Sequence, residues 1–387
     1  MDNQQLLMLR EAIGKLDKSL LDLFAQRRAL SLQVAEEKYS KKMSIRDQAQ
    51  EQKLLKRLLG DAKLLGLDTS TTLSLFHKIL DDSVRTQYDY FLAQETDFKV
   101  DGKLAVLGSK TSYSAIAARN HFSTKPYSYE LHYFDNFQTI FSAIKNGDCD
   151  YGIIPIENTF SGNIPEIHDL IREFEVKVIG EEKLRVKHCL IGLAGAQLKD
   201  ITDVYSHPQA IIQSKDFLTE YSHLNAHMRN STSSALKFIE GQKQKSLAAI
   251  ASEEAALDSD LQIIANGINN YQDNFTRFIL IAKAAIRIPE AVPAKTSILI
   301  TTQQQAGSLA DCLNILKQYQ INITKIESRP IIGKPWQERF YIDFEGNSES
   351  MKVKKAIHEL ELMTHDLLIL GCYPLHDISA TNLEQLP

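Results

Sequence analysis

Cysteine, tryptophan and long apolar runs are scarce in this sequence. The chain of 387 residues has four cysteines and one tryptophan. The cysteines lie far apart, without a CxxC pair or a disulfide-rich spacing, so we expect reduced thiols and a cytoplasmic protein. No apolar run approaches the ~20 residues that span a bilayer, and the amphipathic N-terminal segment is unlike a signal peptide. We therefore expect neither export nor membrane insertion.

An excess of positive charge is also missing. The chain has 44 Lys and Arg residues against 49 Asp and Glu residues, which gives a formal net charge of −5. Such a chain has no basic field that would bind nucleic acid or an anionic membrane surface. We expect no metal and no cofactor. Any anionic ligand must therefore be bound by individually placed residues.

The distribution of proline and glycine predicts a multidomain chain. Residues 1–95 contain no proline and three glycines, which indicates three helices, the first very long. Apolar strand-like runs then alternate with helical patterns, so we predict an α/β domain at residues 103–284. After a proline-bearing linker, residues 296–376 show the order βαββαβ, which is typical of an α+β ferredoxin-like domain.

Two cations interrupt the apolar stripe of the first predicted helix. Arg27 and Lys38 continue the three-four spacing of the leucines that precede them. A buried cation needs a compensating anion, so either a bound anionic ligand or a partner carboxylate is required; a Lys that reaches solvent at the helix end is a further alternative. The stripe consists of Leu6, Leu9, Ile13, Leu16, Leu20, Leu23, Leu30 and Val34.

The second and third predicted helices each offer a pair of polar residues on one face. Asp47 and Glu51 are four residues apart, as are Ser83 and Gln87. Together with Arg27, such pairs would line a cavity for a small dianion that also carries a hydroxyl and an ether oxygen.

The segments LREAIGKLDKSLLDLFAQRRAL, EEKYSKKMSIRDQAQEQKLL and ILDDSVRTQ resemble the all-helical class of chorismate mutases. This resemblance implies catalysis by Lys38 and Gln87 at the ether oxygen. A Claisen rearrangement needs no proton transfer, so it depends on holding the reactive conformer and stabilising charge on that oxygen. The chorismate-binding residues implied by the resemblance are Arg10, Arg27, Lys38, Asp47, Glu51, Ser83 and Gln87.

The position of Arg10 indicates a dimer. At 1.5 Å per residue, Arg10 lies about 25 Å from Arg27 and about 42 Å from Lys38 along one straight helix. We therefore expect Arg10 to serve the site of a second subunit in an intertwined homodimer or higher homo-oligomer, as the resemblance also implies. Related sequences carry Arg where this one has Gln50, so a carboxylate contact is either weakened or supplied by another residue such as Arg46.

Four strand-to-helix loops mark the α/β domain: LGSKTSYSAIAA, PIENTFSGNIPEI, YSHPQAIIQSKDFL and RNSTSSALKFIE. Each is expected to present backbone N–H groups and Ser, Thr or Asn side chains at a helix N-terminus, where a carboxylate is stabilised. Ordinary helix capping at all four loops is the alternative. Convergence of the loops would instead form a cleft for a polyanion without any Lys or Arg.

A fifth segment, QDNFTRFILIA, completes a resemblance to prephenate dehydratase across nearly the whole domain. The resemblance implies a two-lobed, periplasmic-binding-protein-like fold in which Thr276 assists departure of the ring hydroxyl. A threonine is a poor general acid, but aromatisation and loss of CO₂ supply a large driving force. Departures occur at Ser109, Thr111 and Phe160. The prephenate-binding residues implied are Glu157, Asn158, Ser206, Gln213 and Thr276.

The C-terminal segments QQQAGSLADCLNIL and KIESRPI resemble the ACT domain of phenylalanine-sensing dehydratases. By themselves they are a helix cap and a strand-end turn. The resemblance implies an effector site for phenylalanine between paired domains. Its residues would be Gly307, Ser308, Leu309, Glu327, Ser328, Arg329 and Pro330.

The three segments together resemble a bifunctional chorismate mutase/prephenate dehydratase. Such an enzyme would take chorismate to prephenate and prephenate to phenylpyruvate, with feedback inhibition by phenylalanine. A non-catalytic sensor of aromatic acids, built from the same domains, is the alternative. It would bind chorismate unchanged, so formation of phenylpyruvate from chorismate distinguishes the two hypotheses.

Overall fold

A computed structural model describes residues 2–95, 101–123, 128–257, 259–331, 333–334 and 336–375. These residues divide into two compact units. The helical unit combines residues 2–95 with Arg287–Pro293, and the α/β unit comprises residues 101–286 and 294–375. Residue 376, the predicted end of the third domain, lies outside the described residues.

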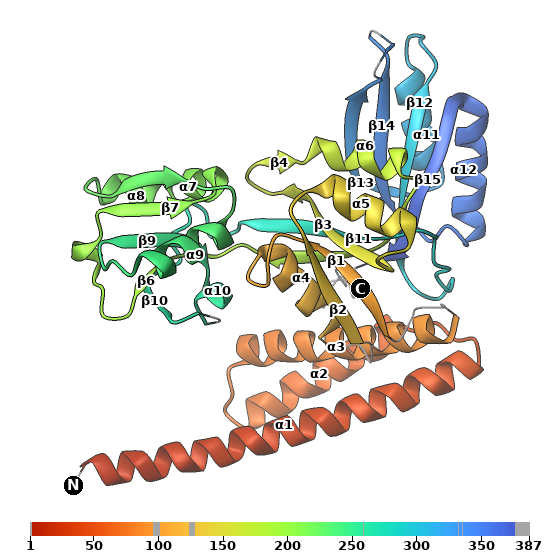
Figure 1. Ribbon diagram of the computed structural model, residues 1–387. Helices are drawn as coiled ribbons and strands as arrows, with labels where there is room; N and C mark the ends of the chain where they lie inside the picture. Colours follow the sequence, from red (N-terminus) through yellow and green to blue (C-terminus); the bar gives the residue numbers. More distant parts are fainter. Residues whose placement is uncertain are drawn as a thin grey trace. The chain divides into compact units, whose positions relative to one another are not determined.

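Three helices form the helical unit, as the sequence predicts (Figure 1). The first helix continues for 39 residues because no proline removes a backbone donor from it. The second begins where the Asp47 side chain accepts a hydrogen bond from the Gln50 backbone N–H, which satisfies one of the free donors of the first turn. The helices are α1 (Asp2–Ser40), α2 (Gln48–Leu64) and α3 (Thr69–Glu95).

Most of the apolar stripe of α1 is uncovered. The unit's small core contains Ala35, Ile45, Leu55 and Phe91, each at most 3% exposed. The stripe is far more exposed, although its residues are as apolar as those of the core. The exposed fractions are 45% for Leu6, 56% for Leu9 and Ile13, 65% for Leu16, 64% for Leu20 and 60% for Leu23. A contiguous apolar surface of this kind is typical of an interface.

The first lobe of the α/β unit is built on a sheet with strand order β2-β1-β3-β11-β5, where β4 pairs with β3. Strand β1 is parallel to both neighbours, whereas β11 is antiparallel to β3 and β5. The elements are β1 (Asp101–Leu107), α4 (Tyr113–Phe122), β2 (Ser128–Phe134), α5 (Phe137–Asn146), β3 (Tyr151–Asn158), β4 (Gly162–Asn163), α6 (Pro165–Glu173), β5 (Lys177–Arg185) and β11 (Phe275–Ala282).

The second lobe is inserted between β5 and β11, so the chain crosses between the lobes twice. Its sheet has the order β10-β6-β9-β7-β8 (Figure 1). The elements are β6 (His188–Leu193), the 3₁₀-helix η1 (Leu198–Asp200), β7 (Asp203–Ser206), α7 (Pro208–Gln213), α8 (Lys215–Glu220), β8 (Asn225–Met228), α9 (Thr232–Gln242), β9 (Leu247–Ser252), α10 (Glu253–Leu257) and β10 (Leu261–Asn266).

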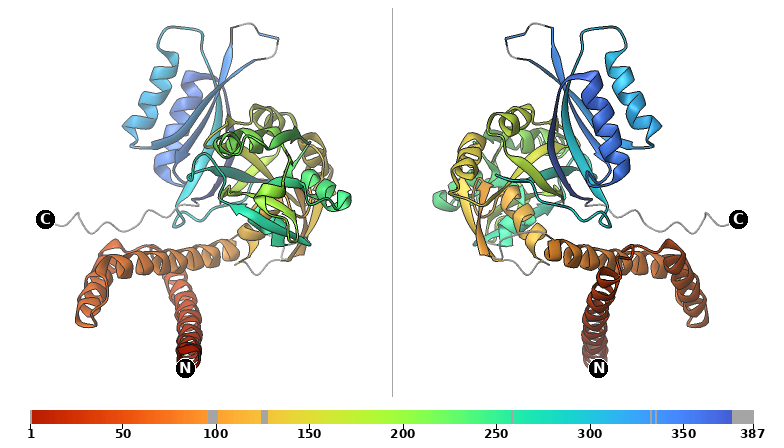
Figure 2. Two further views of the ribbon diagram at one scale, coloured as in Figure 1. Left: turned by 90° about the vertical axis from the view of Figure 1, so that its left-hand side faces the viewer. Right: turned by 90° about the vertical axis from the view of Figure 1, so that its right-hand side faces the viewer.

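The C-terminal domain has the predicted order βαββαβ. Its sheet runs β13-β14-β12-β15, which makes β13 an edge strand, and α11 and α12 pack side by side on one face (Figure 2). The elements are β12 (Ala294–Thr302), α11 (Ser308–Gln318), β13 (Asn322–Pro330), β14 (Glu338–Glu345), α12 (Met351–Met363) and β15 (Thr364–Pro374).

The C-terminal domain and the first lobe share one hydrophobic core. Leu299, Tyr341 and Leu370 of the C-terminal domain belong to the same buried cluster as the apolar side chains of β3, β5, α5 and α6. At Gly371 the backbones of β15 and β5 approach so closely that a Cβ atom would lie 1.9 Å from the Val178 carbonyl oxygen. Only glycine fits at this position.

Candidate active sites and effector pocket

A cavity of about 330 Å³ lies among the three helices of the helical unit. Each helix contributes polar side chains to it, because the three-four spacing places them on the inward faces. Six of the seven predicted chorismate-binding residues line this cavity: Arg27, Lys38, Asp47, Glu51, Ser83 and Gln87.

The two cations of the cavity are half-buried and already hold protein partners. Arg27 donates hydrogen bonds to the Ser83 hydroxyl and, at 3.2 Å, to the Ile79 carbonyl oxygen. The Lys38 ammonium group donates to the Ile45 carbonyl oxygen. Burial lowers the pKa of Lys38 from its usual value, and the nearby carboxylates of α2 oppose that shift. Burial disfavours the charged forms of both cations, and an anionic ligand would stabilise those charged forms again.

The α2 side of the cavity is organised around Glu51. The Arg46 guanidinium lies 3.2 Å from the Glu51 carboxylate. Arg46, which was expected to supply the carboxylate contact missing at Gln50, is therefore paired with Glu51. Gln50 itself lines the cavity. The Gln87 side-chain oxygen is buried without a hydrogen-bond partner among the described residues, which leaves it available to a ligand.

Arg10 is the predicted residue that the structure does not bring to the cavity. It lies exposed on α1, far up the same helix from Arg27 and Lys38. The cavity of a single chain therefore contains two of the three predicted cations.

The α/β unit brings Asn158 and Thr276 together by strand pairing. These residues are directly opposite each other in the β3–β11 register, and Asn158 Nδ2 lies 3.0 Å from Thr276 Oγ1. Gln213, at the end of α7 in the second lobe, donates to Asn158 Oδ1 at 3.3 Å. Three of the five predicted prephenate-binding residues thus form one hydrogen-bonded cluster that spans both lobes.

The other two predicted prephenate-binding residues lie elsewhere. Glu157 precedes Asn158 and therefore faces the opposite side of the sheet, where its carboxylate pairs with Lys325 and, at 3.1 Å, with Arg277. Burial raises the pKa of Glu157, but those two cations lower it further, to below its usual value. Ser206 is 0% exposed and donates to the Ile250 carbonyl oxygen inside the second lobe.

Three residues of the cluster were missed by sequence reasoning: Asn274, His188 and Tyr113. Asn274 donates to Gln213 Oε1 at 3.0 Å, and the His188 ring nitrogen Nε2 lies 2.8 Å from the same oxygen. Asn274 could have been found, because it stands just before β11 and two residues before Thr276, the spacing that repeats one face of an extended chain. No spacing in the sequence relates His188 or Tyr113 to Thr276 in this way.

A cavity of about 380 Å³ adjoins this cluster, although Asn158 and Thr276 themselves are not part of its lining. Gln213 and Asn274 form part of its lining, together with Phe160 and Tyr271. Asp273 is the one charged residue in that lining, so binding of an anion here must rely on amides, hydroxyls and backbone dipoles.

The predicted helix caps are only partly right. Ser112 caps α4 and Ser231 caps α9, in both cases by accepting a backbone N–H with the side-chain oxygen. Helix α7 is capped by the His207 ring, not by Ser206. Helix α6 has no side-chain cap and begins at Pro165, whose missing N–H leaves one donor fewer to satisfy.

The opposite face of β11 carries a buried ionic cluster. Arg277 is 8% exposed and lies 2.8 Å from both the Glu181 and the Asp343 carboxylates. The Lys295 ammonium group also lies 2.8 Å from Glu181. Because Asp343 and Lys295 belong to the C-terminal domain, this cluster joins that domain to the first lobe.

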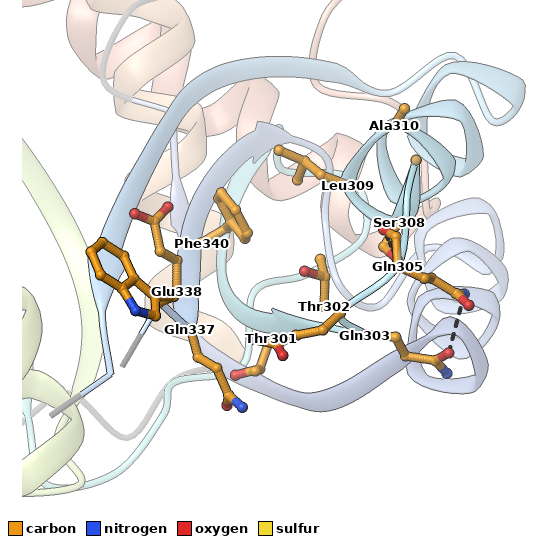
Figure 3. A pocket seen from close by; sticks show the side chains of 13 residues that line it. Thr301, Thr302, Gln303, Gln305, Ser308, Leu309, Ala310, Gln337, Glu338 and Phe340 are labelled. Carbon is orange, nitrogen blue, oxygen red and sulfur yellow. Dashed lines mark hydrogen bonds between the residues drawn. The ribbon is translucent and has the colours of Figure 1, made fainter. Parts of the chain in front are cut away.

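A third cavity, of about 340 Å³, lies in the C-terminal domain at the start of α11 (Figure 3). Gly307, Ser308 and Leu309 line it, and Gly307 has a φ of 85° that favours glycine. Phe340 and Trp336 supply apolar surface. The other predicted effector residues, Glu327, Ser328, Arg329 and Pro330, belong to edge strand β13 and are not part of its lining.

No helix in the described ranges is long and apolar enough to cross a membrane. Within the same ranges, His, Cys, Asp and Glu side chains do not cluster in a way that would hold a metal ion.

Comparisons with known proteins cover nearly the whole chain. Residues 9–88 match the family model for chorismate mutase type II, and residues 104–286 match that for prephenate dehydratase. The bifunctional chorismate mutase/prephenate dehydratase of Escherichia coli strain K12 is 38% identical over 376 residues, which cover 96% of this chain and 97% of that protein.

Two solved structures are similar to the α/β unit. The prephenate dehydratase from Staphylococcus aureus subsp. aureus Mu50 is 26% identical, with a TM-score of 0.62 over 70% of this chain and 99% of that one. The prephenate dehydratase from Arthrobacter aurescens in complex with L-Phe is 22% identical, with a TM-score of 0.65 over 72% and 91% of the two chains.

Proposed function

This chain belongs to the bifunctional chorismate mutase/prephenate dehydratase family, and we propose that its two reactions are divided between the helical cavity and the cleft at Thr276. It rearranges chorismate to prephenate and converts prephenate to phenylpyruvate by dehydration and decarboxylation. The alternative of a non-catalytic sensor is set aside, because the family has both activities. The proposal below concerns which residues perform each reaction.

Lys38 of α1 and Gln87 of α3 act on chorismate in the helical cavity. The Lys38 ammonium group and the Gln87 Nε2 hydrogen that does not bond to the Ser83 carbonyl oxygen would stabilise negative charge on the ether oxygen as its bond breaks. Arg27 would bind a substrate carboxylate with Ser83 beside it. Asp47 and Glu51 would surround the ring hydroxyl, which holds the compact reactive conformer in place.

A second subunit completes this site. The apolar stripe from Leu6 to Leu23 is exposed to solvent, which is unfavourable unless another chain packs on it. Arg10 lies on the same exposed part of α1. An isologous pairing of two α1 helices would bury both stripes and carry each Arg10 to the partner's cavity. We therefore favour the intertwined homodimer.

Complementation tests this assignment. Arg10→Ala and Lys38→Ala should each lower mutase activity by about 100-fold or more when alone. When the two variants are unfolded, mixed and refolded together, they should recover about a quarter of wild-type activity. About half of the dimers then contain one chain of each variant, and one of the two sites in each such dimer is intact. If Arg10 served its own chain's cavity, both sites of every mixed dimer would be defective and no activity would return.

Thr276 acts on prephenate in the cleft. Its hydroxyl would donate a hydrogen bond or proton to the departing ring hydroxyl, while Gln213 and Asn158 orient the substrate and the threonine. The 3.0 Å contact between Asn158 and Thr276 carries this proposal. Glu157 and Ser206 would then act indirectly, Glu157 through the contact with the C-terminal domain.

Thr276→Val tests the dehydratase site, because it keeps the shape and removes the hydroxyl. Phenylpyruvate formation should fall about 100-fold, the scale of assistance by a positioned donor, while prephenate accumulates from chorismate. Thr276→Ser retains the hydroxyl and should remain active. Undiminished phenylpyruvate formation by Thr276→Val would remove this residue from the reaction.

The C-terminal domain is proposed to be an ACT-type regulatory domain that binds phenylalanine. Support comes from its ferredoxin-like order, its cavity at Gly307 and the L-Phe complex of the Arthrobacter aurescens relative. Because Glu327–Pro330 lies on an edge strand away from that cavity, pairing of two β13 strands would bring the two halves of the effector site together.

Gly307→Ala tests the effector cavity. A Cβ atom at a φ of 85° strains the loop, so phenylalanine binding measured by calorimetry should weaken together with inhibition of the dehydratase. Gly333→Ala is a matched control with a φ of 81° outside the cavity lining, and it should bind phenylalanine normally. Equal weakening in both variants would contradict the assignment.

A further inference from the structure

The hydrogen-bonded cluster at Thr276 continues into a buried side chain, His188, and a half-buried one, Tyr113, which the dehydratase assignment leaves unused. The Tyr113 hydroxyl lies 2.9 Å from Nδ1 of His188, and Nε2 of His188 lies 2.8 Å from Gln213 Oε1. His188 is 2% exposed, so it does not contact a ligand in the cleft. Tyr113 begins α4 in the first lobe, whereas His188 begins β6 in the second.

Backbone groups fix the orientation of the Asn158 amide. Its Oδ1 accepts the backbone N–H groups of Phe160 at 3.0 Å and Ser161 at 3.1 Å, and these groups can only donate. The other terminal atom must therefore be nitrogen. Its two hydrogens are shared among three acceptors: Asn274 Oδ1 at 2.7 Å, the Phe275 carbonyl oxygen at 3.0 Å and Thr276 Oγ1 at 3.0 Å.

The orientation of Asn158 determines the next two side chains in turn. The Gln213 atom that faces Asn158 Oδ1 must be a donor, so Gln213 presents its oxygen to His188 and to Asn274. An amide oxygen only accepts, which places the ring proton of His188 on Nε2. Burial lowers the pKa of His188 to about 4, so the ring is neutral near pH 7 and Nδ1 accepts from the Tyr113 hydroxyl.

The far end of this chain is the hydroxyl of Thr276. Because Nδ2 of Asn158 can only donate, Oγ1 of Thr276 faces it as an acceptor. The hydroxyl proton of Thr276 is therefore not used in this contact. Among the described residues, no acceptor lies within hydrogen-bond distance of the Thr276 hydroxyl. That proton remains available for a ligand in the cleft.

We propose that His188 and Tyr113 are positioning residues of the dehydratase: through Gln213 and Asn158 they hold Thr276 as an acceptor toward the protein and a donor toward prephenate. This inference rests on the proposed role of Thr276. The chain of hydrogen bonds runs from the first lobe to the second and back, so it aligns the donor only while both lobes keep this arrangement.

His188→Leu tests the inference by removing the Nε2 donor while keeping an apolar side chain in the site. Its kcat for prephenate should fall about 10- to 100-fold, the scale of a misplaced catalytic group, with KM nearly unchanged. His188→Gln can again donate to Gln213 and should recover most of kcat. His227→Gln, an exposed histidine of the same lobe, is the matched control and should be fully active.

A double-variant cycle separates positioning from folding. In a Thr276→Val background there is no hydroxyl to position, so adding His188→Leu should cause no further loss of kcat. A loss of equal size in both backgrounds would overturn the inference and leave the role of Thr276 intact. Full activity of Thr276→Val alone would overturn the role of Thr276, and this inference with it. If His188→Leu does not fold, Tyr113→Phe replaces it in the same cycle.

Discussion

The two active sites of this chain handle anionic substrates with opposite means. The helical cavity is lined by two half-buried cations, which we propose face its substrate, whereas the residues gathered around Thr276 are amides, a hydroxyl and a neutral imidazole. The mutase reaction develops charge on an oxygen that stays in the molecule, so a fixed cation lowers its barrier. The dehydratase reaction expels a hydroxyl, which needs a directed proton donor. The difference in residue types thus follows the difference in chemistry.

Strand β11 shows how the α/β unit keeps charge away from its reacting centre. Thr276 lies in the hydrogen-bonded cluster with Asn158, and the next residue, Arg277, faces the C-terminal domain with its carboxylate partners. Alternation along one strand therefore separates a neutral polar network from an ionic one by a single residue.

Removal of the mutase cation should have the largest effect. Lys38→Ala should lower mutase kcat about 100- to 1,000-fold, because it removes the donor aimed at the ether oxygen. Dehydratase activity on added prephenate should not change. Lys41→Ala, in an exposed ion pair just beyond the same helix, is the control. Comparable loss of both activities in Lys38→Ala would mean that the sites are not independent.

Breaking the ionic face of β11 should mainly cost stability. The Glu181 side chain is 1% exposed, so Glu181→Gln removes the carboxylate that pairs with buried Lys295 and one of the three carboxylates that pair with Arg277. We expect the free energy of unfolding of the α/β unit to fall by about 3–5 kcal/mol in urea titrations. Glu175→Gln, which breaks an exposed pair with Lys145, should leave the free energy of unfolding almost unchanged. Equal stability of the two variants would contradict the importance of the buried cluster.

The free energy of unfolding of the α/β unit should fall as the pH is lowered, before its carboxylates titrate. Burial lowers the pKa of His188 and of His168 to about 4, below the ordinary 6.5 of the unfolded chain. The unfolded state therefore binds more protons between these values, and stability falls as the pH drops from 6.5 toward 4. The loss should reach at most about 3 kcal/mol for each ring.

Urea unfolding at several pH values measures this loss. His168→Asn should reduce the slope of stability against pH, because one of the two neutral rings is gone. An unchanged slope would show that His168 is protonated in the folded protein.

Patterns within one element were readable from the sequence. The three helices, the βαββαβ order and the cationic positions in the α1 stripe all follow from spacing along a helix or strand. Helical periodicity places most of the six mutase residues on one face of their helices, and the packing of the three helices then brings those faces to one cavity.

Relations between distant elements were not readable. Glu157 and Asn158 are neighbours in the sequence, but strand alternation sends the acid to the C-terminal domain and the amide to the cleft. The contact of His188 with Tyr113 depends on how two lobes close on each other. No local pattern encodes such a contact.

The close contact of Gly371 with Val178 has a practical meaning for feedback-resistant variants. Cutting the chain after Arg287 would uncover the side of the first lobe where Leu299 and Leu370 now pack, and would take Lys295 and Asp343 from their partners. Such a deletion removes part of the dehydratase's own interior along with the C-terminal domain. A desensitised enzyme suited to overproduction of phenylalanine is therefore better sought by point substitutions around Gly307, which leave that interior whole.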